Sequence, residues 1–455
     1  MAGDQAIQVP ASCRVVGVAR PTRDSEIGFE LWLPDGWTGR YAQLGNGGFA
    51  GNIDHPSLAA EIRRGNAAAM TDTGHKAGQF DASWAFGHPE KVIDYGYRSI
   101  KATADAANHL VREYYGRQPQ RRYYIGCSNG GRQALMAAQR YPDDWDGILA
   151  GSPAVQWTRQ LAAFAAFQQR LRSKPENWIP HAKLPAIQRA AMRECTGQIV
   201  RCRIDVGRLI CRGADRPGCL TMGQAASLEL IQSGPDDFPF GFDPRFAAIP
   251  DNWDRWILNA DRDAPSELAF ATQAYRYLVL DRPGWRVEQF DPKDDAARAS
   301  RRVVAGQPLS AILDTDDPNL DRFARHGGKL IIYVGGADAV ILPGPAIDYY
   351  RRLMRNARAS RARTFARLFV APGMQHCQGG PAPNAFGQAW VAPGLSADPR
   401  HDIRSALEAW VERSRPPTAI VAAKFKADRI GAALTATQEL RPYPASAGPI
   451  ITVRP

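Results

Sequence analysis

The feature that most constrains the fold of this chain is a serine enclosed by glycines between a predicted strand and a predicted helix. Residues 126–130 have the sequence Gly-Cys-Ser-Asn-Gly, a match to the pattern G-x-S-x-G, and Gly131 adds a third glycine. Residues 122–125 predict a strand, and residues 132–140 predict a helix. A sharp turn from strand to helix crowds the two backbones, so small residues are needed there. The pattern therefore indicates that Ser128 is a nucleophile, rather than part of an inert glycine-rich turn.

Strands and helices alternate on both sides of this turn. Further predicted strands are residues 27–33, 41–44, 146–150, 329–334 and 365–370, and further predicted helices are residues 94–115 and 347–357. Such alternation is typical of a parallel sheet with crossover helices, an α/β fold. Residues 158–325 lack it, so we expect an inserted domain there, over a discontinuous core of residues 1–157 and 326–455. The end of the chain, from Arg441, looks like a surface tail.

A serine hydroxyl becomes a good nucleophile only when a base removes its proton. Asp338 follows the predicted strand 329–334, and His376 follows the predicted strand 365–370. Both lie where loops leave the carboxyl ends of strands, the edge at which such sheets place their sites. The chain order serine, aspartate, histidine is the hydrolase order. We therefore expect Ser128, Asp338 and His376 to form a catalytic triad; the competing acid, Asp348, lies within a predicted helix.

Such a site also needs backbone N–H groups that stabilise a developing oxyanion. The N–H of Asn129, directly after the serine, is one candidate. Residues 45–48 are Gly-Asn-Gly-Gly and follow the predicted strand 41–44, so Gly47 or Gly48 is the second candidate. The alternative for this glycine run is a plain hairpin turn.

Two of the seven cysteines stand beside the expected nucleophile and base. Cys127 precedes Ser128, and Cys377 follows His376. If the serine and the histidine touch, their neighbours are close enough to bond. We therefore expect a Cys127–Cys377 disulfide, with two buried free thiols as the alternative.

Charge and composition limit the classes of partner. Hydrophobic residues make up 44% and charged residues 23% of the chain, ordinary globular values that exclude a disordered chain. The net charge is +11, but arginines are dense only at residues 351–367, which is more typical of a solvated face than of a nucleic-acid site. No apolar run is long enough for a membrane span. We expect neither a nucleic-acid nor a membrane partner.

The first residues contain no charged segment followed by an apolar segment, so no signal peptide is recognisable in this chain. Four cysteines between residues 195 and 219 favour disulfides and an oxidising compartment. We therefore expect a secreted or periplasmic protein whose signal segment is absent from this chain.

Several motifs resemble those of the tannase and feruloyl esterase family, and the resemblance covers nearly the whole chain. The most specific are residues 126–132 and residues 372–377, Pro-Gly-Met-Gln-His-Cys; residues 46–51, 71–75 and 219–221 are similar to the family as well. The resemblance implies an α/β-hydrolase core, a lid domain, and hydrolysis of esters of aromatic carboxylic acids such as feruloyl or galloyl esters. Mono(hydroxyethyl) terephthalate hydrolases are similar proteins in the same group.

The chain also departs from the family. The family's lid usually carries an acidic calcium-binding loop, whereas residues 195–202 contain no carboxylate, and a hard cation needs several oxygen ligands. We therefore expect no calcium, no other metal and no cofactor. A usual C-terminal cysteine is absent, which leaves Cys13 without a partner. In the lid we expect the pairs Cys202–Cys219 and Cys195–Cys211, although four cysteines allow three connectivities.

Substrate choice is expected to lie in the lid, which is rich in aromatic residues: Phe238, Phe240, Phe242, Trp253, Trp256 and Trp285. Aromatic side chains suit a flat acyl group, and they equally suit the core of a small domain. Asp72 and His75 are expected to be a structural pair near the site. The predicted function is therefore a serine esterase acting on a small aromatic ester. The alternatives are a terephthalate monoester hydrolase with the same triad, or a non-catalytic binding protein on the same scaffold.

Overall fold

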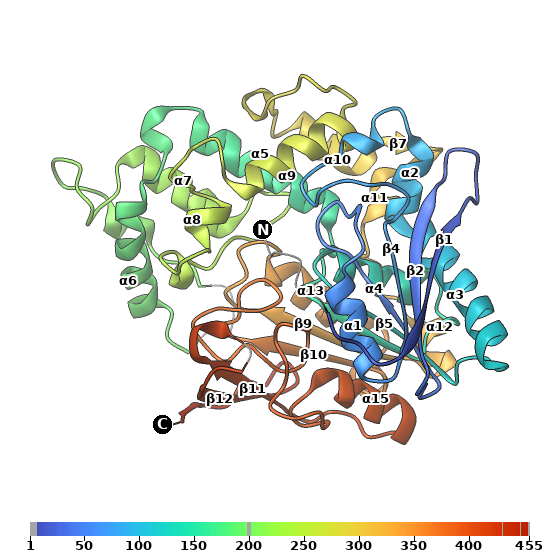
Figure 1. The fold of residues 1–455 in the computed structure, drawn as a ribbon. Helices are drawn as coiled ribbons and strands as arrows, with labels where there is room; N and C mark the ends of the chain where they lie inside the picture. Colours follow the sequence, from blue (N-terminus) through green and yellow to red (C-terminus); the bar gives the residue numbers. More distant parts are fainter. Residues whose placement is uncertain (1–6, 198–201, 430, 446, 454–455) are drawn as a thin grey trace.

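An eight-stranded sheet runs through the computed structural model, which describes residues 7–197, 202–429, 431–445 and 447–453 (Figure 1). The strand order is β1–β2–β4–β3–β5–β6–β9–β10. Strands β1 and β2, and β2 and β4, pair antiparallel, and all other neighbours pair parallel. The bounds are β1 Ser12–Ala19, β2 Ile27–Pro34, β3 Arg40–Leu44, β4 Ala67–Thr71, β5 Arg121–Cys127, β6 Gly147–Gly151, β9 Lys329–Gly335 and β10 Ala366–Ala371. The parallel sheet expected from the alternation is present.

Helices cover both faces of the sheet, and β9 shows why. Its alternate residues Leu330, Ile332 and Val334 belong to the core on one face, whereas Ile331 and Tyr333 belong to the core on the other. This follows from the two-residue period of a strand, and the continuous apolar run is typical of a strand buried on both faces. The first face carries α3 Ser99–Tyr115, α4 Asn129–Arg140, α12 Asp321–His326 and α13 Pro343–Asn356; the second carries α1 His55–Arg63 and α15 Ile403–Arg413.

A long, mainly helical insertion separates β6 from β9. We call residues 158–325 the inserted segment; in Figure 1 its green and yellow helices lie beside the sheet. Its helices are α5 Trp157–Arg172, α6 Leu184–Glu194, α7 Met222–Ser233, α8 Trp253–Trp256, α9 Ser266–Gln273, α10 Asp294–Arg301, α11 Leu309–Leu313 and α12, and its two short strands are β7 Val303–Val304 and β8 Gln307–Pro308. It contacts the loops after β9, so it covers the carboxyl edge of the sheet.

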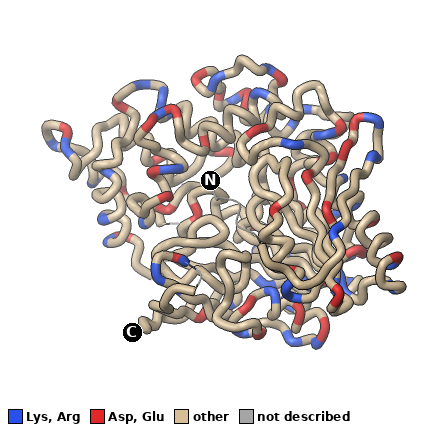
Figure 2. Tube along the Cα trace, viewed as in Figure 1, with Lys and Arg blue, Asp and Glu red and all other residues tan. Residues whose placement is uncertain are grey.

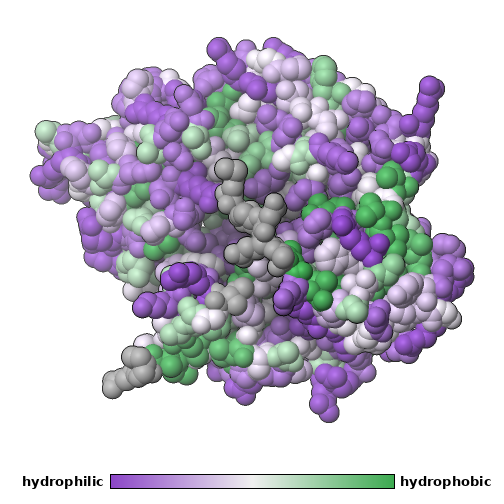
Figure 3. Space-filling view, viewed as in Figure 1, coloured by the Kyte–Doolittle hydropathy of each residue, from purple (hydrophilic) through white to green (hydrophobic). Residues whose placement is uncertain are grey.

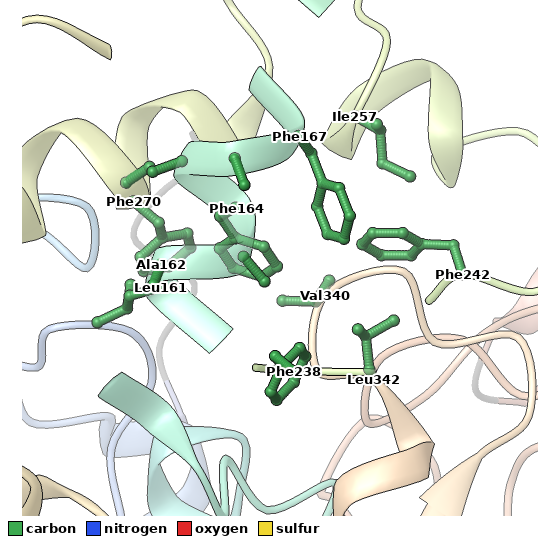
Figure 4. Close-up of a cluster of buried hydrophobic side chains, with 14 of the residues drawn as sticks. Leu161, Ala162, Phe164, Phe167, Phe238, Phe242, Ile257, Phe270, Val340 and Leu342 are labelled. Atoms are coloured by element: carbon green, nitrogen blue, oxygen red, sulfur yellow. The ribbon is translucent and has the colours of Figure 1, made fainter. Parts of the chain in front are cut away.

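Aromatic residues form the core of the inserted segment (Figure 4). Phe238, Phe242, Trp253 and Trp285 are fully buried in one apolar cluster. Of the six aromatic residues singled out in the sequence, Phe240 and Trp256 are only partly buried. Most of this aromatic density therefore builds a core rather than a binding surface.

The C-terminal region is more ordered than a surface tail. Strands β11 Ile420–Phe425, β12 Leu434–Leu440 and β13 Ile450–Thr452 form a second sheet. The amide of Tyr443 donates to the carbonyl of Leu368 in β10 (2.7 Å), and its ring lies edge-on to Tyr350. The expectation of a tail was wrong, because backbone pairing and ring packing fasten this segment to the core.

The remaining helices are short. Helix α2 spans Pro89–Ile93 and continues through a π-helical turn, Asp94–Arg98, into α3; a single helix was expected over residues 94–115. A second π-helical turn, Ala274–Val279, follows α9. Helix α14 spans Ala359–Ala362.

Basic and acidic residues are interspersed over the molecule (Figure 2). In the arginine-rich stretch, Arg352 pairs with Asp348 (2.9 Å) and Arg361 with Asp321 (3.2 Å). Apolar surface gathers near β1 and near the C-terminal strands in Figure 3, where Val16 and Ile451 are exposed. Within the described ranges, no helix has the length and apolar character that crossing a membrane requires.

Candidate active site

Ser128 occupies a strained turn between β5 and α4. Its backbone has φ 65° and ψ −128°, a conformation that serine rarely adopts. The turn is held by hydrogen bonds from Ser128 N to Gly151 O (3.0 Å) and from Arg132 N to Ser128 O (3.0 Å). A Cβ on Gly131 would lie 2.1 Å from Gly151 O, so only glycine fits beside the neighbouring strand. Local crowding therefore explains the glycine at position 131.

Asp338 and His376 form a hydrogen-bonded acid–base pair. His376 Nδ1 lies 2.9 Å from Asp338 Oδ2. The other carboxylate oxygen accepts the N–H groups of Val340 (2.8 Å) and Ile341 (2.9 Å). The Asp338 side chain is fully buried, whereas that of His376 is 20% exposed. With Nδ1–H donated to the carboxylate, Nε2 is left as the basic nitrogen of the ring.

A disulfide joins the serine turn to the histidine loop. Cys127 and Cys377 are bonded across 250 residues of sequence, with their Cα atoms 6.0 Å apart. The bond expected between these two cysteines is therefore present. Because each cysteine adjoins a key residue, the bond holds Ser128 and His376 at the same place on the sheet edge.

The loop after β3 supplies candidate oxyanion donors. Gly48 has φ 56°, and a Cβ there would lie 2.2 Å from Gln79 O, so the loop needs glycine. The carbonyl of Gly48 accepts from Tyr95 Oη (3.1 Å), and that of Gly47 accepts from Ala50 N (2.9 Å). Within the part of the chain that the structure describes, neither the Gly47 nor the Gly48 amide donates a hydrogen bond to the protein. Gly47 is exposed, so its N–H is available to a ligand, whereas Gly48 is buried.

A buried side-chain clamp ties this loop to the helix after the serine. Gln133 Oε1 accepts the backbone N–H of Asn46 (2.9 Å), and Gln133 Nε2 donates to Asn46 Oδ1 (3.3 Å). Asn46 Nδ2 donates in turn to the carbonyls of Asn52 (2.8 Å) and Thr71 (2.7 Å). Gln133 is fully buried and Asn46 is 2% exposed. The clamp fixes the position of Gly47, the next residue, relative to α4.

A buried cation lies one turn after the serine. Arg132 is fully buried, and its Nε donates to Asn129 Oδ1 (2.7 Å). Its guanidinium also donates to the carbonyls of Tyr95 (3.0 Å), Gly96 (3.0 Å) and Leu313 (3.2 Å). Burial lowers the pKa of Arg132 from its usual value. The side chain joins the first turn of α4 to the end of α11.

The disulfides of the inserted segment differ from the expected pairs. Cys195 bonds Cys202 and Cys211 bonds Cys219, so the expected pairs Cys202–Cys219 and Cys195–Cys211 were wrong. Each bond closes a local loop, of 7 and 8 residues along the sequence. Hydrogen bonds from Leu220 N to Leu209 O (2.7 Å) and from Cys211 N to Leu220 O (2.9 Å) bring the second pair together. Cys13 has no disulfide partner.

Asp72 and His75 are both held by hydrogen bonds to backbone groups, a structural role; among the described residues, no hydrogen bond joins them to each other. Asp72 Oδ1 accepts the amides of Gly28 and Gly74, both at 2.9 Å, and burial raises the pKa of its carboxyl to about 6.

The His75 ring instead supports the glycine-rich loop. It stacks on Trp84 with ring centroids 3.8 Å apart, and Nε2 lies 2.8 Å from the carbonyl of Phe49. Burial lowers the pKa of His75 to about 4, so the ring is neutral at neutral pH and Nε2–H donates to that carbonyl. Backbone groups therefore hold both residues, and the Trp84 ring adds packing for His75 alone.

Among the residues with described positions, no three His, Cys, Asp or Glu side chains cluster as metal ligands. The expectation of a calcium-free loop at residues 195–202 falls partly on residues 198–201, which lie outside the described residues. Its described part supplies no carboxylate, so calcium does not fit the residues present there.

With this geometry in place, the comparisons with known proteins identify the class. The family model "Tannase and feruloyl esterase" matches residues 13–449. The chain therefore belongs to the tannase and feruloyl esterase family, and it is a carboxylic ester hydrolase with an α/β-hydrolase fold.

Individual relatives extend over the same region. An uncharacterized esterase of Xanthomonas campestris pv. campestris is 41% identical over 471 residues, covering 96% of this chain and 82% of the relative. Feruloyl esterase C of Talaromyces stipitatus is 29% identical over 424 residues, covering 89% and 77%. The crystal structure of feruloyl esterase B from Aspergillus oryzae has a TM-score of 0.85 at 25% identity and covers 95% of this chain and 87% of that one.

The structure brings together residues that the sequence patterns predict and residues that they miss. Asp338 and His376 are in contact, and the candidate oxyanion loop lies on the same edge as Ser128. Gln133 and Asn46 were not predicted as site residues. Gln133 lies near the glycine-rich start of α4, and its sequence neighbours do not indicate that it contacts Asn46.

Proposed function

We propose that Ser128 is the nucleophile of a Ser–His–Asp esterase. Its Oγ attacks the ester carbonyl while His376 Nε2 takes the hydroxyl proton. Asp338 holds the ring through Nδ1–H and stabilises the imidazolium that forms. The proton then passes to the leaving alcohol, and water, activated by the same ring, releases the acid from the acyl-enzyme. Side chains, backbone and water supply every step, so no metal or cofactor is needed.

Backbone amides stabilise the tetrahedral oxyanion in this proposal. The donors are the N–H of Asn129, the first residue of α4, and the N–H of Gly47 or Gly48. The helix start adds the positive end of its dipole. The free glycine amides and their clamped loop support these roles.

The observation that carries the proposal is the Asp338–His376 pair, tethered by the Cys127–Cys377 bond to the strained serine turn. A purely structural serine turn needs no buried carboxylate on a histidine beside it. This disfavours a non-catalytic binding protein on the same scaffold.

The proposed substrates are esters of aromatic acids, of feruloyl or galloyl type. Feruloyl esterases among the relatives support this class. A terephthalate monoester is the second candidate, because it too presents a flat aromatic acyl group. The inserted segment is proposed to act as the lid that selects among them. Three disulfides favour an oxidising compartment, so a secreted or periplasmic location is proposed.

Initial rates on methyl gallate, methyl ferulate and a terephthalate monoester test both parts of the proposal. We expect the wild type to hydrolyse at least one ester, and Ser128→Ala to lose at least about 10³-fold in kcat. The ester with the highest kcat/KM identifies the acyl group.

A fluorophosphonate probe provides the control for the nucleophile. It should label the wild type at Ser128 and leave Ser128→Ala unlabelled. Equal ester hydrolysis by the two proteins would refute Ser128 as the nucleophile. Failure of the wild type to hydrolyse any ester or react with the probe would favour a binding protein.

A further inference from the structure

Buried amides of the inserted segment hold the loop that carries Asp338. We call residues 336–342 the acid loop. Asn252 Nδ2 donates to the carbonyl of Ala337 (2.7 Å), and Gln160 Nε2 donates to the carbonyl of Val340 (2.8 Å). The two hydrogen bonds fall on either side of Asp338. Both donors come from the inserted segment, and both acceptors come from the core chain.

The same part of the inserted segment also holds the histidine loop. Gln375 Nε2, one residue before His376, donates to the carbonyl of Pro250 (2.9 Å). Pro250 lies two residues before Asn252. Residues 250–252 therefore contact the residue before the acid and the residue before the base. Asp251 between them has φ 56°, so this connection follows an unusual backbone path.

Apolar packing embeds the acid loop in the core of the inserted segment. Val340 and Leu342 belong to the same buried cluster as Phe164, Phe238 and Phe242. Figure 4 shows both side chains among the aromatic rings of that cluster. The acid loop therefore depends on the inserted segment for its packing as well as its hydrogen bonds.

The side chains that donate these two hydrogen bonds are buried away from water. Asn252 is 1% exposed and Gln160 is 2% exposed. Loss of either amide leaves a buried carbonyl without its donor, which favours displacement of the loop. The N–H groups of Val340 and Ile341 bind the Asp338 carboxylate, so displacement of the loop displaces the carboxylate.

We propose that Asn252 and Gln160 are positioning residues for Asp338, through which docking of the inserted segment completes the acid–base pair. The inference rests on the proposed serine esterase function. It makes the inserted segment part of the catalytic geometry, in addition to any part in substrate choice. Neither amide touches substrate; each acts through the backbone of the acid loop.

The test compares neutral, nearly isosteric variants of the two amides. Asn252→Leu and Gln160→Met should each lower kcat on the preferred ester by about 10-fold or more, because small displacements of catalytic groups are costly. KM should change by less than about 3-fold, since ground-state binding is not altered. If Asn252→Leu does not fold, Asn252→Ser, whose hydroxyl is too short to reach Ala337, replaces it.

Gln168→Met is the matched control. Gln168 lies on the same helix as Gln160, is fully buried, and donates to the carbonyl of Ile257 (3.0 Å) within the inserted segment. This variant should lose thermal stability comparably and keep kcat within about 2-fold. Equal kcat for all three variants and the wild type would overturn the inference and leave only a structural role.

A double-mutant cycle separates the inference from the proposed function. In an Asp338→Asn background, with a p-nitrophenyl ester that keeps residual rates measurable, Asn252→Leu should lower kcat by less than about 2-fold further. A full additional loss would show that Asn252 does not act through Asp338. If Ser128→Ala hydrolyses esters as fast as wild type, the proposed function fails. The inference is then judged by fluorophosphonate labelling, which Asn252→Leu and Gln160→Met should slow and Gln168→Met should not.

Discussion

At the scale of single residues, the site is organised by buried amides and one buried arginine. Gln133 holds Asn46 from α4, and Arg132 holds Asn129 beside it. Each of these side chains is at least 97% buried, so water cannot replace its hydrogen bonds. The two candidate oxyanion donors are therefore fixed relative to one another before substrate binds, which is what electrostatic stabilisation of a transition state requires.

Removal of the Gln133 clamp should slow catalysis without weakening substrate binding. Gln133→Met loses both hydrogen bonds to Asn46, so kcat should fall on the order of 10- to 100-fold while KM changes by less than about 3-fold. Gln133→Glu keeps an acceptor for the Asn46 N–H but sets a buried carboxyl oxygen against Asn46 Oδ1, so it should lose activity as well.

Gln139→Met is the matched control for this comparison. Gln139 lies on the same helix and donates to Thr315 O (2.7 Å), away from the oxyanion loop. Its kcat should stay near that of wild type. A loss of kcat equal to that of Gln133→Met would mean that the clamp has no specific role.

Local patterns could be predicted from the sequence, and distant partners could not. The role of Ser128 could be predicted from the adjacent sequence, because strand, glycine and helix patterns lie within a few residues of it. Asn252 and Gln160 contact partners 85 and 180 residues away, and nothing adjacent to either residue marks it. Contacts between distant buried amides follow from the fold and leave no local periodicity.

At the scale of elements, the Cys127–Cys377 bond joins the end of β5 to the loop after β10. These elements are separated by β6 and β9 in the sheet, so the loop after β10 reaches back toward β5 to bring the two Cα atoms within 6.0 Å. Its presence could be predicted because each cysteine adjoins an expected catalytic residue. The disulfide pairs of the inserted segment could not be predicted, because the hydrogen bonds near Leu220 that bring Cys211 to Cys219 leave no pattern in the sequence.

Removal of this bond should cost both stability and activity. The chain-entropy model gives about 5.5 kcal/mol for closing 250 residues, and about 2.5 kcal/mol for closing 8. We expect Cys127→Ser/Cys377→Ser to lower the free energy of unfolding by the larger amount and to lower kcat. The control Cys211→Ser/Cys219→Ser should show the smaller loss and an unchanged kcat. Denaturant unfolding measures the free energy of unfolding, and initial rates measure kcat. A larger loss of stability in the control than in Cys127→Ser/Cys377→Ser would contradict the expectation.

At the scale of the whole molecule, one buried carboxylate joins the start of the inserted segment to the residue after its helix α11. Asp314, directly after α11, accepts Thr158 N (2.8 Å) and Thr158 Oγ1 (2.7 Å) at the start of α5. Beside it, Thr315 N donates to Val155 O (2.8 Å). The chain therefore leaves and re-enters the core at one point. The sequence predicts the insertion from lost alternation, but not the residue that closes it.

This carboxylate should make stability depend on pH. Burial raises the pKa of Asp314 to about 7, against an ordinary value of 3.8, despite the hydrogen bonds from Thr158 and the nearby charge of Arg159. A folded-state pKa above the unfolded value contributes stability that is present at low pH and lost as pH rises from about 4 to about 7. Asp314→Asn removes that loss, so its Tm relative to wild type should be higher at pH 8 than at pH 5. The same Tm difference between Asp314→Asn and wild type at both pH values would contradict the assignment.

Trapping the acyl-enzyme tests directly whether Ser128 is the nucleophile. Wild-type protein is mixed with an excess of the preferred aromatic ester, quenched in acid during turnover, digested, and analysed by peptide mass spectrometry. The account predicts one acyl group on the peptide that contains Ser128, and none in Ser128→Ala. An acyl group on another residue, or steady ester hydrolysis by Ser128→Ala at the wild-type rate, would contradict it.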